Sequence, residues 1–331
     1  MNIKEFSKKM QQSIQEYYGE NVNVVINEVT KNNGIVLEGM SIMEKEKNIS
    51  PTIYLNRFLK EYEEGATFAA CFRKVIDVYE ENRTTHSIDM EFFTEYEKMK
   101  SKIVYKLINY DRNKTLLNEI PHIKYLDLAI VFYCIITDDL IGNATILIQN
   151  KHADIWGVKV EELYEKANIN TPKLLPYEIQ NMEEVMRQIL LEKLKSEYEN
   201  AEIKQYEENR NHDIPSDEEW LEQMTEMMLK NTIPDGGNAM YVLSNRTRLL
   251  GAACLLYQNV LEEFSSKLEK DFYILPSSIH ELILIPVEEN HETTKLNEMV
   301  REVNHTQVEM EEVLADHAYY YSRQDRKLSV V

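Results

Sequence analysis

The chain has 331 residues, of which 43% are hydrophobic and 28% charged, which excludes an intrinsically disordered chain and allows a core of ordinary size. Its 57 acidic and 37 basic residues give a net charge of −20, and so negative a surface argues against direct binding of nucleic acid, because it repels phosphate backbones. The most apolar run, residues 126–136, falls well short of the roughly 20 residues that a membrane-spanning helix needs.

The first elements are indicated by apolar spacing and by glycines. A helix is predicted to end at Gly19, because apolar residues recur at helical spacing before it: Phe6, Met10, Ile14 and Tyr17. Residues 32–34, Asn-Asn-Gly, lie between two alternating runs and predict a β-hairpin, since Asn and Gly tolerate a positive φ. After Pro51, two helices joined at Gly65 are expected.

The middle of the chain predicts strands with little helix between them. Residues 102–109 indicate a strand, residues 112–119 a short helix, and residues 125–136 a buried strand rich in β-branched and aromatic side chains. We place a domain boundary here. Residues 1–120 would hold a helix, a hairpin and a helical pair, and residues 121–331 an α+β region.

Two nine-residue segments resemble each other: GNATILIQN at 142–150 and GNAMYVLSN at 237–245. Both begin with Gly-Asn-Ala and end in Asn, and an acidic amphipathic helix is expected after each, at 160–167 and 260–268. The similarity predicts an internal duplication of a strand–turn–helix unit, spanning residues 142–168 and 237–268.

A helical insertion is predicted between these units, near 175–235. Its first helix has one apolar stripe: Met182, Val185, Met186, Ile189, Leu190, Leu194 and Tyr198. Ser216 and Glu219 form a capping box for a second helix, which places four large side chains on one face: Trp220, Met224, Met227 and Met228. Met-rich helical faces can bind partner helices, although such a stripe is more often part of a core.

The C-terminal third predicts two strands, 272–275 and 282–287, around a turn at 276–278, followed by helices at 294–303 and 310–321 and a loose tail from 322. The predicted fold class is α+β, with a mixed, mostly antiparallel sheet, flanking helices, the internal duplication and the helical insertion.

Familiar catalytic and cofactor motifs are absent from the sequence. There is no phosphate-binding loop and no GxGxxG fingerprint, which argues against a common nucleotide enzyme. His280 and Glu281 begin an HExxH zinc motif, but Leu284 occupies the position of the second histidine. We therefore expect no cofactor and no metal.

One polar cluster offers weak candidates for a site. Ser277, Ser278, His280 and Glu281 lie within five residues between two apolar strands. A hydroxyl, an imidazole and a carboxylate suggest a nucleophile with its base, with Ser278 and His280 as catalytic candidates and Ser277 and Glu281 as binding candidates. Catalytic triads usually join different elements, and neighbours on a strand point to opposite faces, so a structural turn is the favoured interpretation.

The three cysteines, Cys71, Cys134 and Cys254, lie far apart in apolar stretches without a CxxC pair. Such spacing is typical of buried, reduced thiols in an intracellular protein. The first residues also lack the apolar segment of a secretory signal. Cytoplasmic location is the expectation.

Five segments distributed over nearly the whole chain carry a resemblance to a known family: residues 51–65, 126–133, 144–157, 240–264 and 272–286. They include PTIYLNRFLKEYEEG, LDLAIVFY, ATILIQNKHADIWG, MYVLSN with GAACLLYQNVLEEF, and FYILPSSIHELILIP. With these segments the chain resembles a bacterial family known only as a domain of unknown function, found mainly in anaerobic Gram-positive gut bacteria. The resemblance implies no catalytic residue. It identifies Asn245, a further binding candidate, and the turn at 276–281 as parts of a family pattern, from which residues 175–235 depart.

Three function classes remain open. The leading hypothesis is a non-enzymatic protein-interaction or regulatory module, whose partner would bind acidic or Met-rich helical faces. The second is a hydrolase or transferase of unrecognised type at Ser278 and His280. The third is an acidic decoy of a nucleic-acid-binding protein. The sequence leaves the oligomeric state open.

Overall fold

The computed structural model describes residues 1–331 except 46, 49, 84–90, 139–141, 201–216, 233–238 and 289–292. The chain divides into two compact units, Met1–Thr171 with Glu309–Glu312, and Pro172–Val308 with Val313–Val331. The division falls inside helix α8 (Val160–Leu174), between Thr171 and the helix-interior Pro172. The boundary predicted near residue 120 lies within the first unit.

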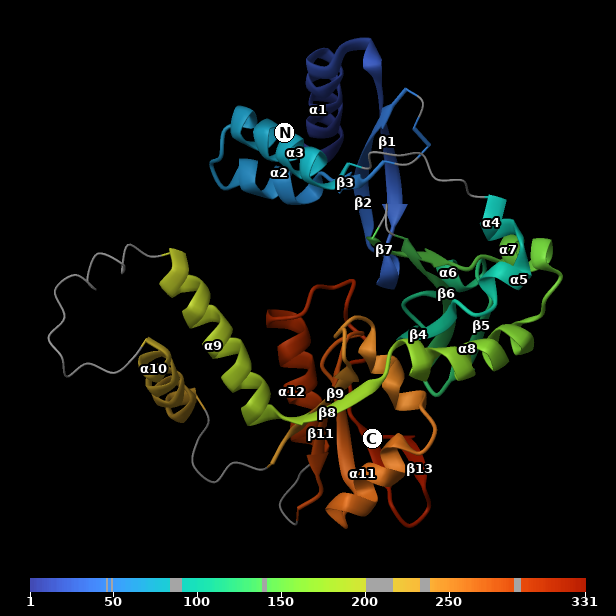
Figure 1. The fold of residues 1–331 in the computed structure, drawn as a ribbon, viewed down its shortest axis with the longest axis vertical. Coiled ribbons are helices and arrows are strands. Elements are labelled where there is room, and N and C mark those ends of the chain that lie inside the picture. Colours follow the sequence, from blue (N-terminus) through green and yellow to red (C-terminus); the bar gives the residue numbers. More distant parts are fainter. Residues whose placement is uncertain are drawn as a thin grey trace, which may run out of the picture. The chain divides into compact units, whose positions relative to one another are not determined.

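The first unit begins with a small three-stranded sheet covered by helices (Figure 1), in the order α1 (Ile3–Tyr18), β1 (Val22–Thr30), β2 (Val36–Glu44), β3 (Thr52–Tyr54), α2 (Asn56–Glu63) and α3 (Phe68–Asn82). Asn2 and Glu5 form a capping box at the start of α1, and Gly19 ends it with φ +65°. The apolar stripe of α1 lies fully buried in the core of this part, with Phe6, Met10 and Ile14 at its centre.

The predicted hairpin is confirmed. Strands β1 and β2 pair antiparallel from Val22 opposite Glu44 to Thr30 opposite Val36. The turn places Asn33 at φ 59° and Gly34 at φ 70°, the left-handed conformations that these two residue types tolerate. The helical pair joined at Gly65 is confirmed as α2 and α3.

A second sheet of the first unit has four antiparallel strands: β4 (Ile103–Asn109), β5 (His122–Tyr125), β6 (Leu128–Asp138) and β7 (Gly142–Leu147). β6 lies centrally, paired with β4 on one side and with β5 and β7 on the other. Five helices belong to this part: α4 (Glu91–Thr94), α5 (Tyr96–Met99), α6 (Lys114–Leu117), α7 (Asn150–Trp156) and α8. The predicted buried strand corresponds to β6, which follows β5 after a two-residue turn at Leu126 and Asp127.

The second unit contains a six-stranded antiparallel sheet with strand order β13-β12-β10-β11-β9-β8. Its strands are β8 (Tyr177–Asn181), β9 (Tyr241–Asn245), β10 (Phe272–Pro276), β11 (Leu282–Pro286), β12 (Tyr319–Ser322) and β13 (Lys327–Val330). Strands β10 and β11 confirm the two predicted C-terminal strands. With its antiparallel sheets flanked by helices, the protein is α+β, as predicted.

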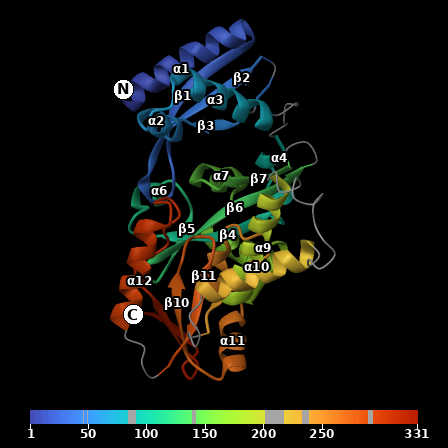
Figure 2. The ribbon, with the colours of Figure 1, turned by 90° about the vertical axis from the view of Figure 1, so that its left-hand side faces the viewer.

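Helices cover both faces of this sheet. α11 (Val260–Leu268) packs Phe264 against Phe272 and Tyr241 on one face. α12 (Thr293–Thr306) packs Leu296 and Val300 against the other face. Figure 2 shows these two helices on opposite sides of β10 and β11. The sheet is therefore buried on both sides along its centre.

The helices predicted in the insertion are present as α9 (Met182–Asn200) and α10 (Asp217–Thr232). They pack against each other through the rings of Tyr198 and Trp220, and Arg187 pairs with Glu226. Val185 is buried, so part of the stripe predicted on the first helix is core, whereas Met227 on the predicted face of the second helix is exposed. The capping box at Ser216 lies outside the described residues.

Two C-terminal predictions are wrong. The predicted helix 310–321 is absent: residues 310–318 form turns and irregular chain, and Tyr319, Tyr320 and Tyr321 belong to strand β12, which pairs with β10. The predicted loose tail contains β13, which pairs with β12 and buries Leu328. Helical spacing and strand alternation are hard to separate in so short a run of tyrosines.

The two similar nine-residue segments both contain a strand, β7 and β9, and the helices expected after them are present as α8 and α11, but the segments differ at their ends. In the first, Asn150 begins helix α7, whereas Asn245 at the same position of the second is the last residue of strand β9. Gly157 ends α7, but Gly251 opens a 3₁₀-helix, Gly251–Leu256. Gly237 and Asn238 lie outside the described residues.

The described helices include none that unites the length and the apolar character needed to cross a bilayer.

Candidate functional site

The residues predicted from the sequence gather around one loop cluster in the second unit. Asn245, at the end of β9, is 1% exposed and organises the turn after it. Its Oδ1 accepts hydrogen bonds from the backbone N–H and hydroxyl of Thr247, and its Nδ2 donates to the carbonyl of Leu249 at 2.8 Å. These bonds satisfy the buried amide by closing an Asx-type turn.

Ser278 and His280 are bonded to backbone groups of the same cluster. The Oγ of Ser278 accepts from the backbone N–H of His280 at 2.9 Å, and the His280 Nδ1 accepts from the backbone N–H of Leu250 at 3.0 Å. The His280 carbonyl in turn accepts from the hydroxyl of Ser244. An imidazole whose Nδ1 already accepts a backbone proton is held as a structural acceptor.

The remaining predicted residues lie at the rim of this cluster. Ser277 and Glu281 are half-buried, and the carbonyl of Glu281 accepts from the backbone N–H of Ser278 at 3.3 Å. Gly251 lets the loop approach the turn, since a Cβ there would lie 2.1 Å from the Oγ of Ser244 and 2.6 Å from the carbonyl oxygen of His280. The structure thus brings the sequence candidates together as a packed junction of two loops.

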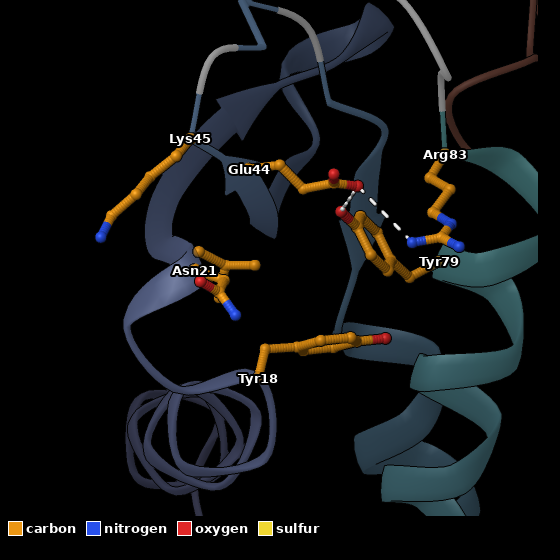
Figure 3. Close-up of a pocket in the computed structure, with 7 residues that line it drawn as sticks. Tyr18, Asn21, Glu44, Lys45, Tyr79 and Arg83 are labelled. Carbon is orange, nitrogen blue, oxygen red and sulfur yellow. Dashed lines mark hydrogen bonds and ion pairs between the residues drawn. The ribbon is translucent and has the colours of Figure 1, made fainter.

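A polar hollow of about 290 Å³ lies in the first unit between the ends of α1, β2 and α3 (Figure 3). The carboxylate of Glu44 accepts from the hydroxyl of Tyr79 at 3.0 Å and lies 3.7 Å from Nη1 of Arg83. Its other oxygen lies 2.8 Å from Nζ of Lys47. The hydrogen bond with Lys47, above all, holds the pKa of Glu44 below its usual value.

The second carboxylate near this hollow is also paired. Glu80 accepts from the hydroxyl of Tyr18 at 2.6 Å and from Nε of Arg83 at 2.9 Å. Burial, followed by the bond to Glu80, raises the pKa of Tyr18. Because acids, bases and hydroxyls are matched to one another here, the network explains local structure and leaves little charge for a ligand.

A third candidate site is a larger hollow of about 590 Å³ in the second unit, between the edge strand β8 and helix α11. Its walls combine aromatic, aliphatic and acidic side chains: Tyr177, Glu178, Ile179, Asn181, Glu184, Tyr241, Val260, Glu263, Phe264, Lys267 and Leu268. The size and the mixed lining are those of a ligand-binding cleft. We call it the β8–α11 groove.

Strand β8 presents an unpaired backbone beside this groove. In the described sheet it is the last strand and pairs only with β9. Bonds from Arg246 N–H to the Pro176 carbonyl and from Met182 N–H to the Met240 carbonyl fix which residues face β9. By antiparallel alternation the N–H and C=O groups of Tyr177, Ile179 and Asn181 therefore point away from β9.

The groove is acidic and aromatic. Its lining includes three acidic residues, Glu178, Glu184 and Glu263, and one basic residue, Lys267. The hydroxyl of Tyr177 donates to Glu263 at 3.3 Å, and burial followed by this carboxylate raises the pKa of Tyr177. Tyr177 remains 39% exposed, so its ring is available to a ligand. Rings and carboxylates together form a surface suited to a cation.

The groove was not predicted from the sequence, because β8 lies within the segment 175–235 that was predicted to be a helical insertion. Only Ile179 among its central residues is aliphatic, and a polar edge strand gives no alternation to detect. Pro176 directly before it was a usable signal, since proline favours strand starts and edges. Within the described residues, no cluster of His, Cys, Asp and Glu is arranged to hold a metal ion.

Comparison with known proteins identifies one family. A family model, described as a family of unknown function (DUF5688), matches residues 3–323. The match confirms the resemblance carried by the five segments. No curated protein and no solved structure matches the chain.

Proposed function

Because the chain belongs to DUF5688, a family of unknown function, we propose its function from the geometry alone: it is a protein-interaction module that binds an extended basic segment of a partner protein in the β8–α11 groove. The observation that carries the proposal is the unpaired backbone edge of β8 beside an acidic, aromatic hollow. The three free and buried cysteines support a reducing compartment, such as the cytoplasm, as the place of this interaction.

The backbone of β8 supplies the first part of the binding energy. An extended segment that adds to a sheet edge gains main-chain hydrogen bonds with the outward N–H and C=O groups, here those of Tyr177, Ile179 and Asn181. The side chains of the same three residues line the groove. One ligand strand therefore meets the free backbone and the groove wall together.

The side chains supply the selectivity. Glu184 and Glu263 attract a Lys or Arg side chain, and the rings of Tyr177 and Tyr241 can receive its cation and stem. A second copy of this chain is disfavoured at the same edge, because two chains with a net charge of −20 repel each other. The net charge of −20 adds long-range attraction for a basic partner.

The proposal is tested with two fluorescent peptides of equal length that alternate Thr with either Lys or Glu. Fluorescence anisotropy should show that the Lys-Thr peptide binds at least about tenfold more tightly than the Glu-Thr peptide, a difference of about 1.4 kcal/mol. Replacing Glu263→Gln together with Glu184→Gln should weaken binding of the Lys-Thr peptide by a similar factor.

Glu63→Gln together with Glu64→Gln is the matched control, since it also removes two negative charges, at the exposed end of α2, far along the chain from β8. It should leave binding nearly unchanged. Equal affinity of both peptides, or equal weakening by the control and the groove variants, would show that only general charge attraction is at work and would refute the groove.

A further inference from the structure

The tip of the β1–β2 hairpin is fixed against the start of α6 within the first unit. The backbone N–H of Asn33 donates to Oδ1 of Asn113 at 2.8 Å, and Nδ2 of Asn113 donates to Oδ1 of Asn33 at 3.0 Å. Nδ2 of Asn113 also donates to the carbonyl of Asn109, the last residue of β4. These bonds hold the neighbouring Lys31 close to the four-stranded sheet.

One face of that sheet carries bases and no described acid. In the register of the sheet, Lys106 of β4 and His122 of β5 both lie opposite Val131 of β6, so the three side chains form one row on one face. Lys124 follows on the same face of β5. The other described residues of this face are uncharged: Val104, Ile108, Ala129, Tyr133, Ile135, Thr145 and Leu147.

Lys106 is half-buried in this row, and its amine makes no ion pair or hydrogen bond with a described residue. Burial lowers the pKa of Lys106, and the charge of Lys31 lowers it further. Lys31 is likewise without a carboxylate partner in the described part of the chain, and its ammonium lies 4.1 Å from the centre of the Tyr54 ring. The charge of Lys31 therefore adds to the cost of the partly desolvated Lys106 amine.

Unpaired amines in such a place cost stability unless an anion joins them. The chain has 57 acidic side chains, yet in the described residues none of them pairs with the amine of Lys106 or Lys31. We propose that Lys31 and Lys106, assisted by His122, form a binding site for a small oxyanion, that is, a phosphate or carboxylate group.

His122 can assist because its side chain lies on the same sheet face as Lys106, in the same row. Its Nδ1 lies 3.1 Å from the carbonyl oxygen of Ile120, which makes Nδ1 the protonated nitrogen and leaves Nε2 as the second position of the ring. A lysine amine binds phosphate as a point charge with three hydrogen-bond donors. The site therefore does not need the planar, two-pronged donor geometry of arginine.

The test uses isothermal titration calorimetry of the full chain with inorganic phosphate and, in a second arm, with acetate, at constant ionic strength. Wild-type protein should bind at least one of the two anions. Lys106→Met and Lys31→Met should each weaken that binding by about tenfold or more. Lys106→Arg, which keeps the charge, should retain it. Which anion binds distinguishes a phosphate site from a carboxylate site.

Lys60→Met is the control, because Lys60 is an exposed lysine of α2 in the same unit. It should bind the anion like the wild type. Circular dichroism verifies that each variant is folded, and Lys31→Met keeps the test valid if Lys106→Met fails to fold. The proposal is overturned if neither anion binds, or if binding survives in both methionine variants.

Discussion

Single buried polar residues hold the loop cluster of the second unit. The amide of Asn245, the hydroxyl of Ser244 and the imidazole of His280 each bond to backbone groups of a neighbouring loop. A buried backbone N–H or C=O that loses such a partner costs about 1–3 kcal/mol. The residues that looked catalytic by their chemical type therefore have a structural task here.

Gly251 is the residue on which this cluster depends most sterically. Gly251→Ala should destabilise the second unit by about 3 kcal/mol, because its Cβ would lie within 2.7 Å of three polar atoms, one of them the backbone N of Asn245. Thermal or urea unfolding measures the change.

The control is Gly157→Ala, where φ is +65° but no atom lies within 4 Å of the added Cβ. Its cost should be limited to the left-handed backbone, about 1 kcal/mol. Equal effects of the two substitutions would contradict the steric explanation.

The lowered pKa of Lys106 predicts how the stability of the protein depends on pH. Its pKa is lower in the folded protein than the ordinary value of 10.5, so the unfolded chain binds more protons between the two values. Stability must then rise with pH in that window, and be lowest where the amine is charged in both states.

The measurement is the free energy of unfolding from pH 7 to 10 for wild type and Lys106→Met, in a buffer without phosphate or carboxylate. The wild type should gain stability relative to the variant as the pH rises. Tyrosines such as Tyr18 and Tyr79, whose pKa values are raised by burial, affect both proteins equally and cancel. A constant difference would contradict the unpaired amine.

Among the elements, β8 has two chemically different edges. The N–H of Gln180 points toward β9, whereas that of Ile179 points outward. Ile179→Pro should therefore leave the sheet folded but abolish binding of the Lys-Thr peptide, since proline is tolerated at a strand edge and removes an outward donor.

Gln180→Pro is the matched substitution one residue away. It removes a bond within the sheet and should lower the stability of the second unit, by about 3 kcal/mol by analogy with proline in regular structure. Unfolding curves and peptide anisotropy on both variants test the assignment. If Ile179→Pro binds the peptide normally, the edge is not the docking site.

Elements with a local chemical cause could be predicted from the sequence. The hairpin followed from Asn33 and Gly34, and the end of α1 from Gly19, because positive φ favours these residue types. The turn between β5 and β6 could not be found this way, since its Leu126 adopts φ 53° without such a signal. Strand β12 was missed because its pairing with β10 is long-range, with Ile274 opposite Tyr319, and β13 was missed because it pairs in turn with β12.

The candidate groove was beyond sequence reasoning for the same physical reason. Tyr177 and Glu263 become neighbours only because β8 and α11 meet at one sheet edge. The sequence did predict that Asn245, Ser278 and His280 belong to one family pattern, and the structure places them in one cluster. Their chemistry could not be inferred from their spacing, because it depends on the backbone groups of Leu249 and Leu250.

On the scale of the whole molecule, the net charge of −20 governs encounter with a basic partner. The association rate of the Lys-Thr peptide should fall several-fold between about 50 and 500 mM salt, because the Debye length shrinks from above 10 Å to a few Å. Stopped-flow fluorescence measures this rate. The dissociation rate should change less, since it reflects the main-chain bonds and ring contacts at β8. A rate of association independent of salt would contradict electrostatic attraction.

Residue-resolved amide hydrogen exchange of the wild-type protein, with and without the Lys-Thr peptide, tests the interaction proposal most directly. The outward amides of Tyr177, Ile179 and Asn181 should exchange quickly in the free protein and become protected when the peptide binds. The amides of Glu178 and Gln180, already bonded to β9, should be protected in both states. Peptide binding that leaves the three outward amides as unprotected as before would contradict docking at β8.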